Sequence, residues 1–205
     1  ELGATTVMLT SRSGKVPAGQ GLEEHLRWLE AIPTTEVVIK KCDVSSSSSV
    51  SELMKEATDS KGPVAGIIHA AGVLDRCPLA EMAKENLDKV CEPKASGAWY
   101  LHSSSEQSDL KLFVLFSSVS ATVGLAGGAS YSAANAYLDA LALWRREKPL
   151  AALSAKWGPV SEVGMTAASG SDSMLEAMAL KALSPAQVGS AMRLLLTQQG
   201  AGVNL

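Results

Sequence analysis

Short apolar runs alternate along the chain with segments in which apolar residues recur at helical spacing. The apolar runs predict strands at Thr5–Thr10, Val37–Lys40, Val64–His69, Leu110–Phe116, Ala151–Trp157 and Gly202–Leu205. The segments between them predict helices at Leu22–Ala31, Val50–Ser60, Lys84–Leu101, Ser130–Arg146 and Pro185–Gln198. Because the strands are apolar rather than cleanly alternating, both faces of the sheet are expected to be covered. The pattern therefore predicts an α/β fold with a doubly wound parallel sheet.

Two polar segments bear on the ends of these elements. Ser184 and Pro185 fit the N-cap and the first position of a helix. The five serines of Ser45–Ser49 are interpreted as a solvated loop between a strand and a helix, in preference to a linker.

At 205 residues the chain is long enough for one sizeable core. No internal repeat or second domain is visible, so residues 1–205 are interpreted as a single domain. A short helix predicted at Met174–Leu183 falls in the segment 166–183, which is placed like a lid over a ligand cleft.

Composition narrows the classes of partner. A net charge of −3 and a pI near 5.7 give no basic surface for nucleic acid. The three cysteines form no ligand spacing with the three histidines, so no metal site is expected, and the thiols are interpreted as reduced and mostly buried. No apolar run approaches the roughly 20 residues that cross a bilayer, and no signal peptide is visible. A cytoplasmic protein without membrane contact is expected.

Four polar residues carry the candidate chemistry: Tyr131, Asn135, Ser118 and Lys94. Asn135 follows Tyr131 by one helical turn and shares its helix face. A phenol has an ordinary pKa of roughly 10, so at neutral pH it is protonated and can give its proton to a carbonyl oxygen. A nearby ammonium favours the phenolate, and a serine hydroxyl can hydrogen-bond the same oxygen. These groups suit the reduction of a ketone once a hydride donor is present.

Seven motifs follow one another along nearly the whole chain. They are LTSRSG (Leu9–Gly14), CDVS (Cys42–Ser45), HAAGVLD (His69–Asp75), EPKASGAWYLH (Glu92–His102), FSS (Phe116–Ser118), YSAANAYLDALA (Tyr131–Ala142) and WGPVSEVGM (Trp157–Met165). With these motifs the chain resembles the ketoreductase domain of modular type I polyketide synthases and of related multifunctional fatty-acid synthases. That domain is a branch of the short-chain dehydrogenase/reductase superfamily. A Lys upstream of the Tyr and an Asn after it are typical of this branch, whereas ordinary short-chain reductases have the two exchanged.

The resemblance implies a role for each of the four polar residues. Tyr131 would donate the proton, Ser118 would orient and polarise the substrate carbonyl, and Lys94 would lower the pKa of the phenol. Asn135 would hold the geometry of the proton relay. A lone tyrosine would ordinarily be a packed helix residue, but the other three at family spacing reverse that interpretation. Ser117 is expected to point away from Ser118 and to be structural.

The resemblance also implies NADPH as the cofactor. Arg12, which by sequence alone would be a solvated residue at a strand end, is placed where a guanidinium binds the 2′-phosphate. Ser11 would add a hydroxyl to that phosphate. Asp43 and Val44 would lie against the adenine ring, and an ordinary turn role for Asp43 is held equally open.

The remaining cofactor contacts are expected at two further strand ends. They are Ala70, Ala71, Gly72, Gly158, Pro159 and Val160. The first three are small and would let the backbone approach the ribose, and the last three would present backbone groups to the nicotinamide carboxamide. His69 is interpreted as a satisfied structural histidine, because Tyr131 already fills the role of the acid.

The first strand of the family fold, with the glycine-rich turn that holds the pyrophosphate, is expected upstream of Glu1. The residues Glu1–Ala4 fit the end of the helix that follows that turn, and Gly124–Gly128 is assigned to the substrate loop instead. The expected fold is therefore a Rossmann-like sheet of the short-chain reductase type without its first, central strand. The chain alone is expected to be inactive.

The function implied by the resemblance is the NADPH-dependent reduction of a β-ketoacyl group on an acyl carrier protein to a β-hydroxyacyl group. The pathway would be polyketide or fatty-acid biosynthesis, with neighbouring synthase domains in the same polypeptide. Two alternatives stay open: a catalytically silent structural fragment of a synthase, and a free-standing short-chain reductase of a small ketone.

Overall fold

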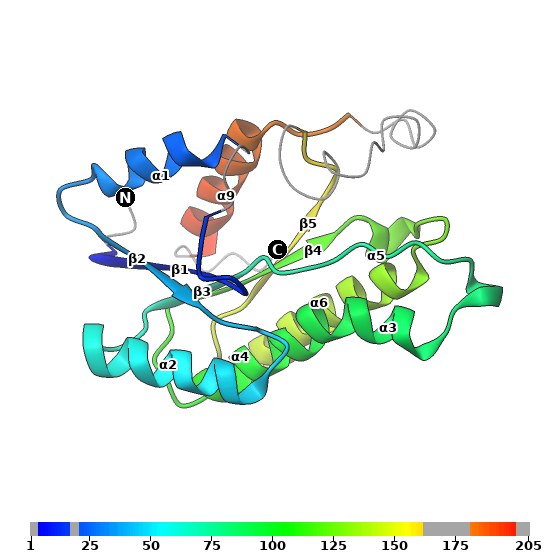
Figure 1. Cartoon of the computed structure of the whole chain (residues 1–205), viewed down its shortest axis with the longest axis horizontal. Helices are drawn as coiled ribbons and strands as arrows, with labels where there is room; N and C mark the ends of the chain where they lie inside the picture. The colour runs from blue at the N-terminus through cyan, green and yellow to red at the C-terminus, as the bar shows by residue number, and fades with distance from the viewer. Residues whose placement is uncertain (1–3, 17–20, 162–180, 200–205) are drawn as a thin grey trace. The chain divides into compact units, whose positions relative to one another are not determined.

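The computed structural model describes residues 4–16, 21–161 and 181–199 (Figure 1). The chain divides into two compact units, Glu1–Lys156 and Trp157–Leu205. The first unit carries every candidate catalytic residue. The prediction of a single domain stays a prediction.

The described strands form two sheets. β1 (Thr6–Ser11) pairs in parallel with β2 (Glu36–Lys41) over its whole length. β3 (Gly66–His69) pairs in parallel with β4 (Leu112–Ser118), and β5 (Leu153–Trp157) follows β4 in the same sheet. The predicted α/β class is confirmed, and each strand end lies within two residues of its predicted position. The strand predicted at 202–205 lies outside the described residues.

β1 and β3 are not joined by any strand in the described part of the chain. The resemblance puts the first strand of the family fold between these two. On β3 the apolar side chain of Ile68 is 53% exposed, whereas Ile67 and His69 on either side are buried. The exposed side chain of Ile68 therefore marks a local opening on β3, next to the place of that strand.

Three helices of the first unit pack around β4. They are α2 (Ser47–Lys61), α4 (Gly97–Ser105) and α6 (Ala129–Glu147), and they lie on the same side of that strand (Figure 1). α2 contacts α4, and α6 contacts β4. Phe113 and Leu115, which are fully buried on β4, meet the apolar residues of these helices in the main core. The main core therefore packs against β4, the strand whose carboxyl end carries Ser118.

Three shorter helical elements also belong to the first unit. They are α1 (Leu22–Glu30), the 3₁₀ turn η1 (Leu79–Glu81) and α5 (Ser120–Val123). Of these, only α1 is predicted from the sequence, because three or four residues are too few to show a helical period.

The serine run begins a helix, so the predicted loop is wrong there. α2 starts at Ser47, and its N-cap Ser46 accepts the backbone N–H of Ser49 on Oγ at 3.3 Å. Ser49 Oγ in turn accepts the backbone N–H of Asp43 at 3.1 Å. Serine hydroxyls satisfy the N–H groups that a first helical turn leaves unpaired, so this polar run favours a helix start over a loop.

The helix predicted at Lys84–Leu101 contains a π turn and ends later, at Ser105. It consists of α3 (Lys84–Cys91), the π-helix η2 (Glu92–Ser96) and α4. Pro93 lies at the start of η2 and has no N–H to donate to the preceding turn. Such π turns within α-helices occur frequently at functional sites.

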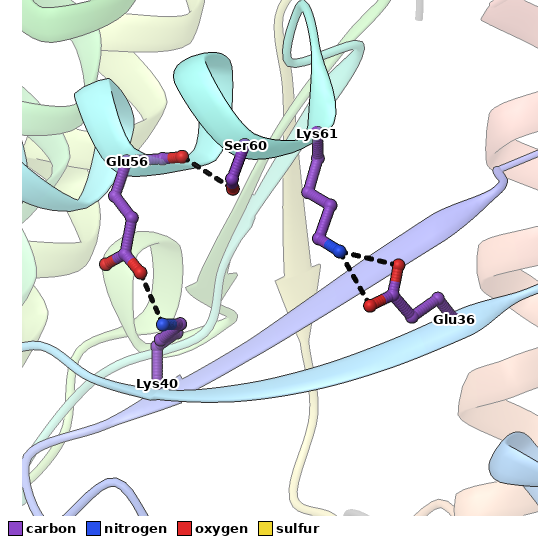
Figure 2. A network of polar contacts seen from close by, with 5 residues as sticks. All are labelled: Glu36, Lys40, Glu56, Ser60 and Lys61. Carbon is purple, nitrogen blue, oxygen red and sulfur yellow. Dashed lines mark hydrogen bonds and ion pairs between the residues drawn. The ribbon is translucent and has the colours of Figure 1, made fainter.

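Two ion pairs join β2 to α2 on the surface (Figure 2). Lys40 pairs with Glu56, and Lys61 Nζ lies 2.6 Å from a carboxylate oxygen of Glu36. Ser60 Oγ donates to the backbone carbonyl of Glu56 at 2.7 Å. Exposed pairs of this kind contribute about 0–1 kcal/mol each, so α2 is held mainly by Val50 and Met54, which it buries in the main core.

The second unit contains α9 (Pro185–Gln199), which begins where the sequence predicts. The backbone N–H of Ser184 donates to Gln187 Oε1 at 2.8 Å, and the N–H of Gln187 donates to Ser184 Oγ at 3.3 Å. This reciprocal cap confirms the predicted helix start.

The end of the helix predicted at Met174–Leu183 is wrong. Residues 181–183 are not helical, and Leu183 forms a parallel bridge with Val160. The N–H of Leu183 donates to the carbonyl of Pro159 at 2.8 Å, so the backbone here is used for extended pairing. The rest of that helix and most of the lid-like segment 166–183 lie outside the described residues.

Cys42 is buried, but Cys77 and Cys91 are partly exposed, so the prediction of mostly buried thiols is wrong. In the ranges that the structure describes, no helix has the length and apolar content that crossing a bilayer requires.

Candidate active site

Lys94 lies in the π turn η2 and is only 3% exposed. Its Nζ donates to the backbone carbonyl of Phe116 at 2.9 Å. The same nitrogen lies 5.5 Å from the centroid of the Tyr131 ring. Burial lowers the pKa of Lys94 to about 8, because the low-dielectric surroundings disfavour the ammonium. At neutral pH a cation therefore lies beside the phenol ring.

The carboxyl end of β4 meets the other site residues through three consecutive positions. The carbonyl of Phe116 accepts from Lys94, and Ser117 Oγ donates to the backbone carbonyl of Asn135 at 3.2 Å. Ser118 Oγ accepts the backbone N–H of Ser120 at 3.2 Å, which leaves its own hydrogen available for donation. Ser117 is buried and used for packing α6 on β4, as predicted.

Tyr131 lies in the first turn of α6 and is partly exposed. Burial of the ring raises the pKa of the Tyr131 phenol, and the polar side chains of Asn135 and Ser118 beside it oppose this rise. The resemblance implies that Lys94 lowers the pKa of Tyr131. The net change is instead a rise, because burial of the ring outweighs the effect of the polar neighbours. The phenol keeps its proton at neutral pH and is suited to act as an acid.

Asn135 is fully buried one turn further along α6. Its Nδ2 donates to the backbone carbonyl of Tyr131 at 2.8 Å. Its Oδ1 has no hydrogen-bond partner among the described residues. A buried acceptor of this kind is ordinarily satisfied by an ordered water. Asn135 thus fixes the turn that carries Tyr131 and presents an acceptor beside it.

His69 ends β3 and is 3% exposed. Its Nε2 lies 3.0 Å from the backbone carbonyl of Lys94. Burial lowers the pKa of His69 to about 4, so the ring is neutral at neutral pH. The prediction of a satisfied structural histidine is confirmed.

Ser11 and Arg12 lie at the carboxyl end of β1, and the chain turns there through Gly14 at φ +66°. A Cβ at Gly14 would lie 3.0 Å from the Cβ of Lys41, so the turn packs closely on β2. Ser11 Oγ donates to the carbonyl of Lys15 at 3.2 Å. The guanidinium of Arg12 belongs to an exposed residue, and the segment 11–16 holds no carboxylate. These residues fit a phosphate, and the 2′-phosphate role of Arg12 stays a prediction.

Asp43 and Val44 follow β2 after one intervening residue, Cys42. Asp43 Oδ1 accepts the N–H of Ser45 at 3.0 Å, which is the local bond of an ordinary Asx turn. Val44 packs against Gly97, where an added Cβ would lie 2.9 Å from Val44 Cγ2. The geometry therefore accounts for Asp43 as a turn residue, and the adenine contact of the pair stays a prediction.

The remaining predicted cofactor residues fall in the two different units. Ala70, Ala71 and Gly72 follow β3 in the first unit as irregular backbone. Gly158, Pro159 and Val160 belong to the second unit, where the backbone of Pro159 and Val160 pairs with Leu183. Their contacts with a nicotinamide cofactor stay predictions.

The loop after Gly72 is tied to α3 by a carboxylate. Asp75 accepts from Asn86 Nδ2 at 2.9 Å and from Lys89 Nζ at 2.5 Å. Both contacts lower the pKa of Asp75, so it stays ionised at neutral pH. Further along the loop, the N–H of Cys77 donates to the carbonyl of Gly127 at 2.8 Å. The substrate loop predicted around Gly127 is thereby joined to the loop that follows β3.

Sequence reasoning missed the carbonyl of Phe116 as the acceptor for Lys94. A backbone carbonyl carries no sequence signal, because every residue has one. The π turn that brings Lys94 toward β4 does have a signal, since Pro93 interrupts an otherwise helical pattern.

Comparison with known proteins gives one family. The family model described as KR domain matches residues 1–162. The spectinabilin polyketide synthase system protein NorB of Streptomyces orinoci is 39% identical over 80% of this chain and 8% of its own length. The phenolphthiocerol synthesis polyketide synthase type I Pks15/1 of Mycobacterium marinum is 37% identical over 94% of this chain and 9% of its own length. The chain thus spans less than a tenth of these relatives.

A solved structure of A-type ketoreductases from a modular polyketide synthase matches the fold with a TM-score of 0.83 at 34% identity. The match covers 94% of this chain and 40% of that one. The Rossmann-like fold of the short-chain reductases, expected from the sequence, is confirmed by this likeness.

Proposed function

The chain belongs to the KR-domain family, the ketoreductases of polyketide synthases, and from that premise we propose that it carries the proton-donating site of a β-ketoacyl reductase. The substrate would be a β-ketoacyl group held on an acyl carrier protein, and the product the β-hydroxyacyl group. Neighbouring domains of the same synthase would be its partners, which is supported by the small share of the relatives that this chain spans.

The convergence of Lys94, Ser118 and Asn135 on Tyr131 is the observation that carries this proposal. NADPH, when bound, supplies the hydride for the carbonyl carbon. Tyr131 holds a proton at neutral pH and gives it to the carbonyl oxygen as negative charge develops there. Ser118 donates its hydroxyl hydrogen to the same oxygen. That hydrogen is available because Ser118 Oγ acts only as an acceptor toward the backbone N–H of Ser120.

Lys94 favours the phenolate that remains after the proton has left. Its ammonium is fixed by the carbonyl of Phe116 and lies near the Tyr131 ring, in surroundings where water screens it poorly. Asn135 anchors the first turns of α6 and offers its unpaired Oδ1 to a water that can return a proton to the phenol.

Substitution of Tyr131 by Phe in the full-length protein tests the assignment. We expect reduction of a β-ketoacyl thioester to fall about 10²–10⁴-fold, because a general acid contributes on that order. Tyr137→Phe is the matched control, since Tyr137 lies on the same helix and is 39% exposed. Turnover by the Tyr131 variant that equals the control would show that the acid is another group.

A further inference from the structure

Lys94 is held at two points by the ends of adjacent strands. Its Nζ donates to the carbonyl of Phe116 on β4, and its own backbone carbonyl lies 3.0 Å from Nε2 of His69 on β3. The two strands are paired in register, with His69 opposite Leu115. Both contacts therefore come from one edge of the same sheet.

The carbonyl that His69 meets lies inside the π turn. The N–H of Gly97 is shared between the carbonyls of Glu92 and Lys94. A shared N–H satisfies each of its acceptors less well than a dedicated donor does. The imidazole supplies a second donor to Lys94, in a place that is closed to solvent.

We propose that His69 is a positioning residue for Lys94: its Nε2–H holds the π turn against β3 and so sets where the ammonium lies relative to the Tyr131 ring. This inference rests on the proposed function, in which the ammonium favours the phenolate. His69 touches neither substrate nor cofactor in this role.

The charge state of His69 makes the inference testable. Burial lowers its pKa to about 4, against an opposing effect of the hydrogen bond to Lys94, so the ring is neutral at pH 7. A neutral imidazole has one N–H, and a carbonyl 3.0 Å from Nε2 requires that hydrogen on Nε2. Replacing His69 with an amide residue therefore removes no charge, whether or not the new side chain keeps the hydrogen bond. A changed pKa of Lys94 in such a variant reports a changed position.

Two amide substitutions show whether the hydrogen bond to the Lys94 carbonyl matters, because both are polar but only one side chain is long enough to form it. In His69→Gln the side-chain nitrogen extends about as far as Nε2, so the bond to Lys94 is kept. In His69→Asn it extends only about as far as Nδ1, so the bond is lost. Ser105→Ala is the control for general destabilisation, because buried Ser105 Oγ also donates to helix carbonyls but lies on α4 beyond the π turn.

The first readout is the titration of Lys94 by NMR, in the 205-residue chain with ¹³C-labelled lysine side chains. We expect the pKa of Lys94 to stay near 8 in the parent, in His69→Gln and in Ser105→Ala. In His69→Asn we expect it to rise toward 10, because a displaced ammonium is better hydrated.

The second readout is ketone reduction by the full-length protein. We expect His69→Asn to lower turnover about 10- to 100-fold, as for a displaced catalytic group, and to move the pH profile, with recovery in His69→Gln. An unchanged Lys94 titration and an unchanged pH profile in His69→Asn would overturn the inference, as would equal changes in the Asn and Gln variants. If the parent itself reduces no β-ketoacyl thioester, the proposed function fails, while the titration still decides whether His69 positions Lys94.

Discussion

Acidification should destabilise the folded chain through His69. The ring is 3% exposed, and burial lowers its pKa to about 4, whereas a histidine in the unfolded chain has a pKa of about 6.5. Between these two values the unfolded chain binds a proton that the folded chain does not. Stability from this group is therefore fully present above pH 6.5 and is lost as the pH falls from there toward 4.

The size of the effect follows from the two pKa values. At about 1.36 kcal/mol for each unit of pKa, the difference between 6.5 and about 4 corresponds to a loss of roughly 3 kcal/mol below pH 4. At pH 5 the same relation gives roughly 2 kcal/mol. Against a total stability of about 5–15 kcal/mol, such a loss is large enough to measure by denaturant unfolding.

Urea unfolding of the 205-residue chain, followed by circular dichroism between pH 7.5 and 5, measures this loss. His69→Gln is the comparison, because it keeps the hydrogen bond but has no group that titrates. We expect the parent to lose about 2 kcal/mol more than the variant over this range. Parallel pH dependences for the two proteins would refute the reasoning, since carboxylates and the other histidines are common to both.

Three further predictions concern catalysis and cofactor binding. Lys94→Met in the full-length protein should move the pH profile of ketone reduction to higher pH, because the cation that favours the phenolate is gone; an unmoved profile would make Lys94 merely structural. Arg12→Ala should weaken NADPH binding by about 1.5–3 kcal/mol and leave NADH binding nearly unchanged, as isothermal titration can show, whereas equal losses would assign Arg12 another role. The 205-residue chain alone should bind NADPH weakly, because its described residues contain no glycine-rich turn for the pyrophosphate; tight binding in a fluorescence titration would contradict this.

The regular elements were predictable because buried strands and helices leave periods in the sequence. α6 matches its prediction to within one residue at each end, since Leu138 and Leu141 recur on its buried face. The serine run at the start of α2 was misread because polarity alone does not distinguish a cap from a loop. The bridge at Leu183 depends on a partner, Val160, far away in the sequence, and no local pattern encodes such a pairing.

The candidate site was predictable as a set of side chains but not as a set of contacts. Family spacing singled out Lys94 and Tyr131, and the structure brings them together. The direction of the Tyr131 pKa depends on how deeply the ring is buried, which only the packed structure determines. The contact between His69 and the Lys94 carbonyl joins two motifs through a backbone atom, so neither motif predicts it.

The last three residues of β4 have a consequence for how this site tolerates insertions and deletions. Ser117 and Ser118 carry identical side chains that point in opposite directions along the strand. For this reason Ser117 hydrogen-bonds to α6, whereas Ser118 lies beside the phenol of Tyr131. A single residue added to or removed from β4 would exchange these directions and also shift the Phe116 carbonyl away from Lys94. Three contacts would then fail together, although the serines themselves would be unchanged. In a library of single-residue insertions and deletions, the end of β4 should lose proton transfer, whereas the turn at Arg12 to Lys15, which carries none of the four candidate catalytic residues, should lose cofactor binding first.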